Sequence, residues 1–206
     1  MTINEAVEQL LLEIVNMDNV PDVNINSVRD ALKSKNPMAS LEDLFSEIYP
    51  NVKFRMLGNS SVANIEADYD PDNNLITIII GGFPKDYSGK APGIIASLHH
   101  ELVHFKQRQK SEKSGLHYKT YDFNYISYVL QHLEIGAYAY QMAKKWYGFS
   151  EISFESVIKY FLPDFMNTIK KEWPSLNKNQ KIWIKKQLSK FKRQYYNQIA
   201  KLQGIK

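Results

Sequence analysis

The sequence predicts an α+β fold that is mostly helical, with a small antiparallel sheet of about three strands ahead of a long helix. Apolar residues recur with the helical period of about 3.6 over most of the chain. Between residues 52 and 80 that period changes to two, which is typical of strands with one buried and one exposed face. The chain is therefore expected to place its sheet just before a helix that starts near Pro92.

Residues 1–50 are predicted to form a helical lead-in that packs on the next part of the chain. The spacing of apolar residues indicates helices over residues 4–16, 26–33 and 41–49. Ser40 is expected to cap the third helix, because a serine hydroxyl at that place accepts a hydrogen bond from an unpaired backbone N–H.

The expected strands lie between residues 52 and 80. Apolar and polar residues alternate over 52–56 and 63–68, and Leu75–Ile80 is rich in β-branched residues and ends at two glycines. Turn-forming residues over 70–74 predict a hairpin centred on Pro71. The last strand, taken as an edge strand, could bind an extended peptide by adding it to the sheet; a plain core strand fits its sequence equally well.

Helices are expected in the rest of the chain. An apolar stripe predicts the helix that starts near Pro92, and the polar residues 110–119 predict an exposed loop after it. The stripe consists of Ile94, Ile95, Leu98, Leu102 and Phe105. Further helices are predicted over residues 123–147, 153–171 and 176–203. This organisation makes residues 51–148 the core domain and residues 149–206 a basic helical extension packed on it.

Composition excludes several classes of protein. The chain has 206 residues and 44% hydrophobic content, which suffices for a folded core. It has no cysteine, so disulfides and thiolate metal ligands are excluded. The N-terminal segment is acidic and amphipathic, unlike a secretory signal, and no apolar run approaches the roughly 18 residues of a membrane span. We therefore expect a cytoplasmic protein.

Basic residues are concentrated at the C-terminal end. From Lys170 onward there are 11 Lys and Arg against one acid, a net of +10, so the other 169 residues carry 15 against 21, a net of −6. This asymmetry indicates an anionic partner, although a solvated lysine-rich helix face explains it as well. Nucleic acid is the partner considered, because Trp183, Tyr195 and Tyr196 lie among the lysines and could stack on bases.

The pattern His-Glu-x-x-His occurs at residues 100–104. Residues four apart share one face of a helix, so the imidazoles of His100 and His104 can converge on one metal ion. Glu101 can then reach a metal-bound water as a general base. The two histidines point away from the apolar stripe of their helix, which places them on a different face from the one that packs on the core.

A catalytic zinc site needs a third protein ligand. Glu134 is the first candidate, because it lies on a helix that could return across the first one and has small, apolar neighbours. Asp122, His117 and His132 remain alternatives, and His132 can be the ligand only if Glu134 is not, since the two lie on nearly opposite sides of their helix.

His100-Glu101-Leu102-Val103-His104, followed by a helix with Glu134-Ile135-Gly136-Ala137, resembles the zincin metallopeptidases of the gluzincin type. It is similar in particular to small cytoplasmic or phage-encoded members whose second motif reads approximately Glu-x-Glu-Ala; Gly136 stands here in place of the second acid. The resemblance covers residues 50 to 148. It implies a zincin-like fold, a Zn²⁺ cofactor held by His100, His104 and Glu134, and peptide hydrolysis in the cytoplasm, which is that of the host if the chain is phage-encoded.

The implied mechanism gives Glu101 the role of general base and needs a further group to stabilise the oxyanion. Tyr138 is taken as that group, with Tyr128, Tyr140 and His117 as alternatives. Two rival functions remain open: a zincin-like scaffold that binds metal without turnover, and a basic helical module that binds nucleic acid or another anionic partner.

Overall fold

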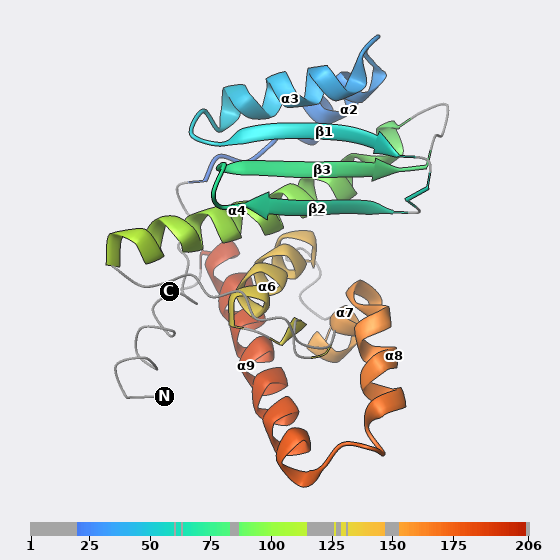
Figure 1. Cartoon of the computed structure of the whole chain (residues 1–206), viewed down its shortest axis with the longest axis vertical. Coiled ribbons are helices and arrows are strands. Elements are labelled where there is room, and N and C mark those ends of the chain that lie inside the picture. Colours follow the sequence, from blue (N-terminus) through green and yellow to red (C-terminus); the bar gives the residue numbers. More distant parts are fainter. Residues whose placement is uncertain are drawn as a thin grey trace. The chain divides into compact units, whose positions relative to one another are not determined.

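A computed structural model of the chain describes residues 20–59, 61–62, 64–82, 87–114, 126, 129–130, 132–146 and 153–204. These residues form seven α-helices and one three-stranded sheet, which confirms the expected mixture of helix and strand (Figure 1). The chain divides into two compact units, one covering Asn16–Gln109 and the other containing Lys110–Lys206. The domain boundaries expected near residues 50 and 148 stay predictions, and the helix expected over residues 4–16 lies outside the described residues.

The sheet of the first unit is mixed, so the prediction of an antiparallel sheet is wrong in part. Its strands are β1 (Lys53–Asn59), β2 (Ile65–Asp70) and β3 (Leu75–Gly81), in the order β1-β3-β2 (Figure 1). The β2–β3 hairpin is antiparallel as expected, whereas β1 pairs with β3 in parallel. The strand just before the long helix is therefore central, and the edges are β1 and β2. A central place suits β3 because its isoleucines 76, 78 and 80 are all buried.

The hairpin turn is stabilised by Asp70. Its carboxylate accepts hydrogen bonds from the backbone N–H groups of Asp72 and Asn73, at 2.9 and 3.2 Å, and from the Asn73 side chain at 2.6 Å. These hydrogen bonds hold the pKa of Asp70 below its ordinary value, and the bond from the Asn73 side chain contributes most. Asn74 has a φ of 51°, a left-handed conformation that asparagine tolerates better than most residues. The predicted hairpin at Pro71 is thus confirmed.

Two short helices precede the sheet, α2 (Ile25–Lys33) and α3 (Pro37–Ile48). α3 begins earlier than expected, because Pro37 suits the first turn of a helix, and the prediction that Ser40 caps it is wrong. The Ser40 hydroxyl lies inside the helix, 2.7 Å from that of Ser34. Glu42 of α3 accepts a hydrogen bond from the backbone N–H of Met56 at 2.7 Å, which ties α3 to β1 and blocks part of that sheet edge.

The long helix α4 (Ala91–Ser114) comes directly after a short 3₁₀ turn, η1 (Ser88–Lys90). Its predicted stripe is confirmed, with four of the five residues buried and Ile95 partly so. The rings of Phe105 and Tyr69 make an edge contact at 6.0 Å, which joins α4 to β2. The loop expected from residue 110 is wrong as far as Ser114, because Lys, Gln and Glu are good helix formers and polarity alone does not end a helix.

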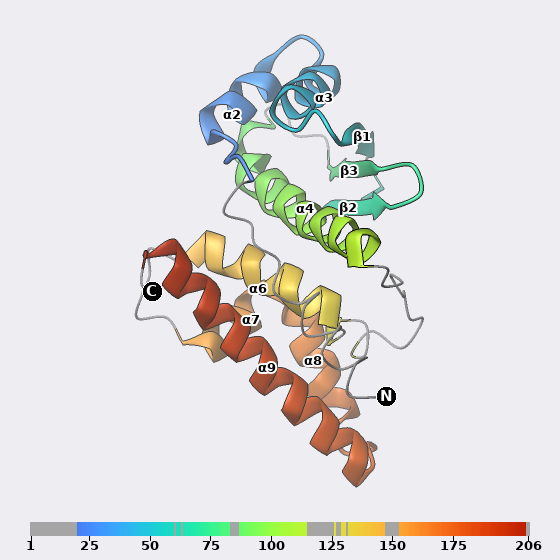
Figure 2. The same ribbon diagram turned by 90° about the vertical axis from the view of Figure 1, so that its left-hand side faces the viewer.

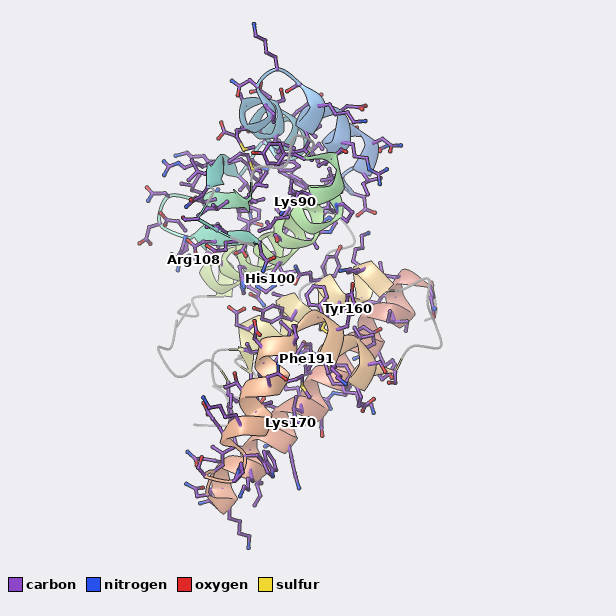
Figure 3. The ribbon with its side chains drawn as sticks, turned by 90° about the vertical axis from the view of Figure 1, so that its right-hand side faces the viewer. Lys90, His100, Arg108, Tyr160, Lys170 and Phe191 are labelled. Carbon is purple, nitrogen blue, oxygen red and sulfur yellow. The ribbon has the colours of Figure 1, made fainter. Side chains whose placement is uncertain are left out.

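The second unit consists of helices α6 (His132–Trp146), α7 (Phe154–Phe161), α8 (Pro163–Glu172) and α9 (Lys178–Leu202). α6 and α9 pack side by side (Figure 2). The apolar cluster of this unit includes Ile135, Met142, Phe165, Phe191 and Tyr195, of which Phe191 is labelled in Figure 3. Among the described helices, none offers the uninterrupted apolar length that crossing a bilayer requires.

Two predicted helices of this unit are divided. The one expected over residues 153–171 breaks at Leu162, whose φ of −124° and ψ of 60° are not helical, because the next residue is Pro163. The one expected over residues 123–147 has a turn at Leu130, so α6 begins only at His132.

Candidate metal centre

His100 and His104 lie one turn apart on α4, and Figure 3 labels the first of them. Both side chains are buried, at 7% and 5% exposure. Their Nε2 atoms are 3.2 Å apart, and their rings meet edge to face with 4.9 Å between the centroids. The four-residue spacing in the sequence therefore brings the two imidazoles together as predicted.

This separation matches the spacing of two ligands on one zinc ion. Zinc–nitrogen bonds of about 2.05 Å at the tetrahedral angle place two nitrogens about 3.3 Å apart. The two Nε2 atoms, at 3.2 Å, already have that spacing. The backbone of α4 thus places the two histidines at a separation that suits binding of one ion.

Glu134 lies in the first turn of α6 and is buried, at 7% exposure. His100 and His104 offer imidazole nitrogens and Glu134 offers a carboxylate oxygen, which are donor atoms that a divalent metal ion takes. The described residues thus include two imidazoles and one carboxylate, all buried, that could supply the ligands of a metal ion. Such a donor set suits Zn²⁺, which accepts nitrogen and carboxylate oxygen alike and often has three protein ligands in catalytic sites.

Glu101 is the residue after His100 on α4 and is also buried, at 7% exposure. Burial of a carboxylate beside two metal-ligand candidates is unusual for a residue without a role, because a charged side chain loses its hydration there. Its place next to the two imidazoles is the place that the His-Glu-x-x-His pattern requires of a general base. Whether Glu101 acts as one stays a prediction.

The tyrosines proposed to stabilise an oxyanion lie close to Glu134 in the sequence of α6. Tyr138 is one turn beyond Glu134, so the two share a face of the helix, and its ring is partly buried against the apolar cluster. Tyr140 is buried at 6% exposure. His117, Asp122, Tyr128 and the side chain of His132 lie outside the described residues, so these alternatives stay open.

Gln107 was not predicted from the sequence as part of the site. It is buried completely, and its Oε1 lies 2.9 Å from Nδ1 of His104. Its position three residues after His104 was the available signal, because residues three apart are neighbours on a helix. An amide that supports a ligand carries no metal-binding pattern of its own.

Gln141 is a second buried amide, on α6. It lies seven residues after Glu134 on α6, which is the same helix face, and is 8% exposed. Among the described residues its Oε1 has no hydrogen-bond partner.

Comparisons with known proteins add no relative. No protein-family model matches the chain, and no curated protein and no solved structure matches it significantly.

Proposed function

We propose that the chain is a zinc-dependent metallopeptidase that hydrolyses peptide bonds. The observation that carries this proposal is the pair of buried imidazoles of His100 and His104, whose Nε2 atoms lie 3.2 Å apart. The buried carboxylate of Glu134 is proposed as the third ligand of the same ion. The general base expected beside such ligands is present as Glu101. The zincin-like character of the fold is part of the same proposal, supported by a helix that carries the ligands and by the sheet that precedes it.

The three ligands would hold Zn²⁺, which supplies Lewis-acid activation of water and of the scissile carbonyl. Glu101 removes a proton from the attacking water and passes it to the leaving amine. Tyr138 donates a hydrogen bond to the oxyanion that develops on the carbonyl, with Tyr140 as the alternative donor. Burial of Glu101 limits the access of bulk water to its carboxylate.

The edge of β2 is the proposed place for an extended substrate. In the described part of the chain β2 pairs with β3 alone, so its other edge presents backbone N–H and C=O groups. β2 runs beside α4 and contacts it at two places. Ile65 of β2 lies against Gly93 of α4, so that a Cβ added to Gly93 would be 2.7 Å from the Cδ1 atom of Ile65. The ring of Tyr69 in β2 contacts the ring of Phe105 in α4. These two contacts flank the stretch of α4 that carries His100 and His104. A peptide added to β2 would therefore pass alongside the ligand-bearing stretch.

Glu101→Gln tests the catalytic role directly. The amide keeps the size of the side chain but cannot accept the proton, so we expect peptide hydrolysis to fall about 10²–10⁴-fold while the zinc content stays at the wild-type level. Hydrolysis is measured on a quenched-fluorescence peptide library, and zinc by mass spectrometry. Glu155→Gln, the same change at an exposed position of α7, is the matched control and should keep full activity. Glu101→Gln with undiminished hydrolysis would contradict the proposal.

A second candidate function is supported by α9, which has no acidic residue. Its inner face is buried at Ile184 and Phe191, whereas Lys186 and Arg193, each two residues further and so about 200° round the helix, are exposed. Trp183 and Tyr196 are 39% and 42% exposed on the same helix. Exposed cations among exposed aromatic rings are what a single-stranded nucleic acid contacts through phosphate and base. We propose this surface as a binding site for single-stranded nucleic acid.

Salt dependence tests this second function. Binding of a fluorescent single-stranded oligonucleotide, followed by anisotropy, should weaken about tenfold or more between 50 and 200 mM salt and should survive removal of metal by a chelator. Lys186→Glu combined with Arg193→Glu should weaken it further, whereas Lys159→Glu, an exposed charge reversal on α7, serves as control. Equal affinity in all variants, or affinity independent of salt, would reject the surface as a nucleic-acid site.

A further inference from the structure

Gln107 contacts the side of His104 that faces away from His100. The Nε2 atom of His104 lies 3.2 Å from Nε2 of His100, whereas its Nδ1 atom lies 2.9 Å from Oε1 of Gln107. The two ring nitrogens of His104 therefore have separate partners. Gln107 is completely buried, so water cannot take its place beside Nδ1.

The contact favours one position for the proton of His104. A neutral imidazole has one N–H group and one nitrogen with a free lone pair. The carbonyl oxygen of Gln107 can only accept a hydrogen bond, so the proton belongs on Nδ1, which donates to it. The lone pair is then on Nε2, the atom that faces His100 and the ligand group.

From this geometry we infer that Gln107 is a positioning residue for metal binding: it fixes the tautomer and ring orientation of His104 so that Nε2 is the ligand atom. The inference rests on the proposed metal centre. Metal-binding histidines generally donate their second N–H to a carbonyl or carboxylate, and loss of that acceptor typically weakens metal binding about 10–100-fold. Gln107 supplies the acceptor from the next turn of the same helix, so α4 carries both the ligand and its support.

The neutral amide also limits how strongly His104 donates electrons. A carboxylate at this place would draw the Nδ1 proton toward itself and make the imidazole a more basic ligand. An amide holds the proton without adding negative charge. Among the three ligands only Glu134 then brings a negative charge to the ion, which keeps the ion more electrophilic.

Two substitutions of Gln107 separate the acceptor from simple packing. Gln107→Met keeps the length of the side chain and removes the acceptor; Gln107→Glu keeps an acceptor oxygen. Gln187→Met is the matched control, because Gln187 is also buried, at 8% exposure, but lies on α9. Zinc affinity is measured by competition with a chromophoric chelator, and the tautomer of His104 from the ¹⁵N chemical shifts of its ring in the metal-free chain.

We expect Gln107→Met to bind zinc about 10–100-fold more weakly and to show a mixed tautomer at His104. Gln107→Glu should retain at least the wild-type affinity and the Nδ1–H tautomer, and Gln187→Met should match the wild type in both. Wild-type affinity and tautomer in Gln107→Met would overturn the inference. The inference would also be overturned if Gln107→Glu lost as much zinc affinity as Gln107→Met. This second comparison remains useful if the methionine variant folds poorly.

The failures of the two proposals can be told apart. Zinc binding that depends on Gln107, in a chain that hydrolyses no peptide, would reject the peptidase and support the role of Gln107. A wild-type chain that binds no zinc would overturn both.

Discussion

The donor set of the candidate centre determines how a bound ion would act. In the proposed centre His100 and His104 would bind as neutral imidazoles and Glu134 as a carboxylate, so a Zn²⁺ ion with charge +2 and one ligand of charge −1 would keep a net charge of +1. That residual charge is what polarises water and a carbonyl oxygen. Replacing a histidine by a second carboxylate would cancel it, which is why two imidazoles and one carboxylate suit hydrolysis.

A pair of single residues on the helical unit gives a prediction about pH. Lys192 Nζ lies 2.7 Å from Glu155 Oε1, and this hydrogen bond lowers the pKa of Glu155 below its ordinary 4.5 and raises the pKa of Lys192 above its ordinary 10.5. The carboxylate stabilises the fold above pH 4.5, and this contribution is lost as the pH falls through its lowered pKa. The ammonium contributes below pH 10.5, and its contribution is lost as the pH rises through its raised pKa.

We therefore expect Glu155→Gln to lower the urea midpoint slightly at pH 7, by less than a core substitution would, because the pair is exposed. The difference from the wild type should vanish at roughly pH 2–3, well below the carboxyl's ordinary range. Urea unfolding followed by circular dichroism at both pH values measures this. A difference of equal size at both would show that the carboxylate charge does not stabilise the fold.

At the residue level the sequence could predict the ligands on α4 but not their support. His100 and His104 are close because four residues make about one helical turn, which is a local property. Glu134 comes 30 residues after His104 and could be chosen only as the acid that a returning helix could bring near. Gln107 could not be predicted, because a buried glutamine among polar residues has no sequence signal apart from its spacing. Only the 2.9 Å contact with Nδ1 reveals it.

Among the elements, β3 organises the first unit, and the end of this strand is tightly enclosed. A Cβ added at Gly81 would lie 2.2 Å from the backbone oxygens of both Val62 and Asn64, and the Gly81 N–H donates to the Asn64 oxygen at 2.8 Å. Backbone atoms cannot yield as the end of a flexible side chain can. The segment that joins β1 to β2 can therefore keep its path only if position 81 has no Cβ.

Gly81→Ala should destabilise the chain by about 1–3 kcal/mol or more, because the added methyl group forces the backbone of the β1–β2 connection to move. Gly89→Ala is the control, since a Cβ there meets nothing within 4 Å. Chemical denaturation of the two variants measures the difference. Equal stability of the two variants would show that the β1–β2 connection can move to accommodate the methyl group with little loss of stability.

The elements themselves were predicted where local signals decide them. The apolar stripes of α4 and α9 and the hairpin at residues 70–74 are consequences of periodicity and turn chemistry. The parallel pairing of β1 with β3 could not be predicted, because strand order depends on tertiary packing and not on which strands are neighbours in the sequence. The break at Pro163 could have been, since proline has no N–H for a helix interior and disfavours the helical conformation of the residue before it.

For the whole molecule, the basic residues and the proposed metal ligands lie on different helices. The net +10 from Lys170 onward falls mostly on α9, whereas the ligands of the proposed metal centre lie on α4 and α6. Metal removal and high salt should therefore act on different functions: a chelator on hydrolysis, and salt on the binding of an anionic partner. If the chelator and high salt abolished hydrolysis and binding to the same extent, the proposal of two independent sites would be contradicted.

The most direct test of the central claim is the zinc content of the purified chain, measured by inductively coupled plasma mass spectrometry for the wild type, His104→Ala and Glu134→Ala. The proposed centre predicts one zinc per wild-type chain, lost in both variants, because each removes one of three ligands. Zinc retained in Glu134→Ala would move the third ligand to another residue, and a wild-type chain without zinc would contradict the metal centre and the peptidase together.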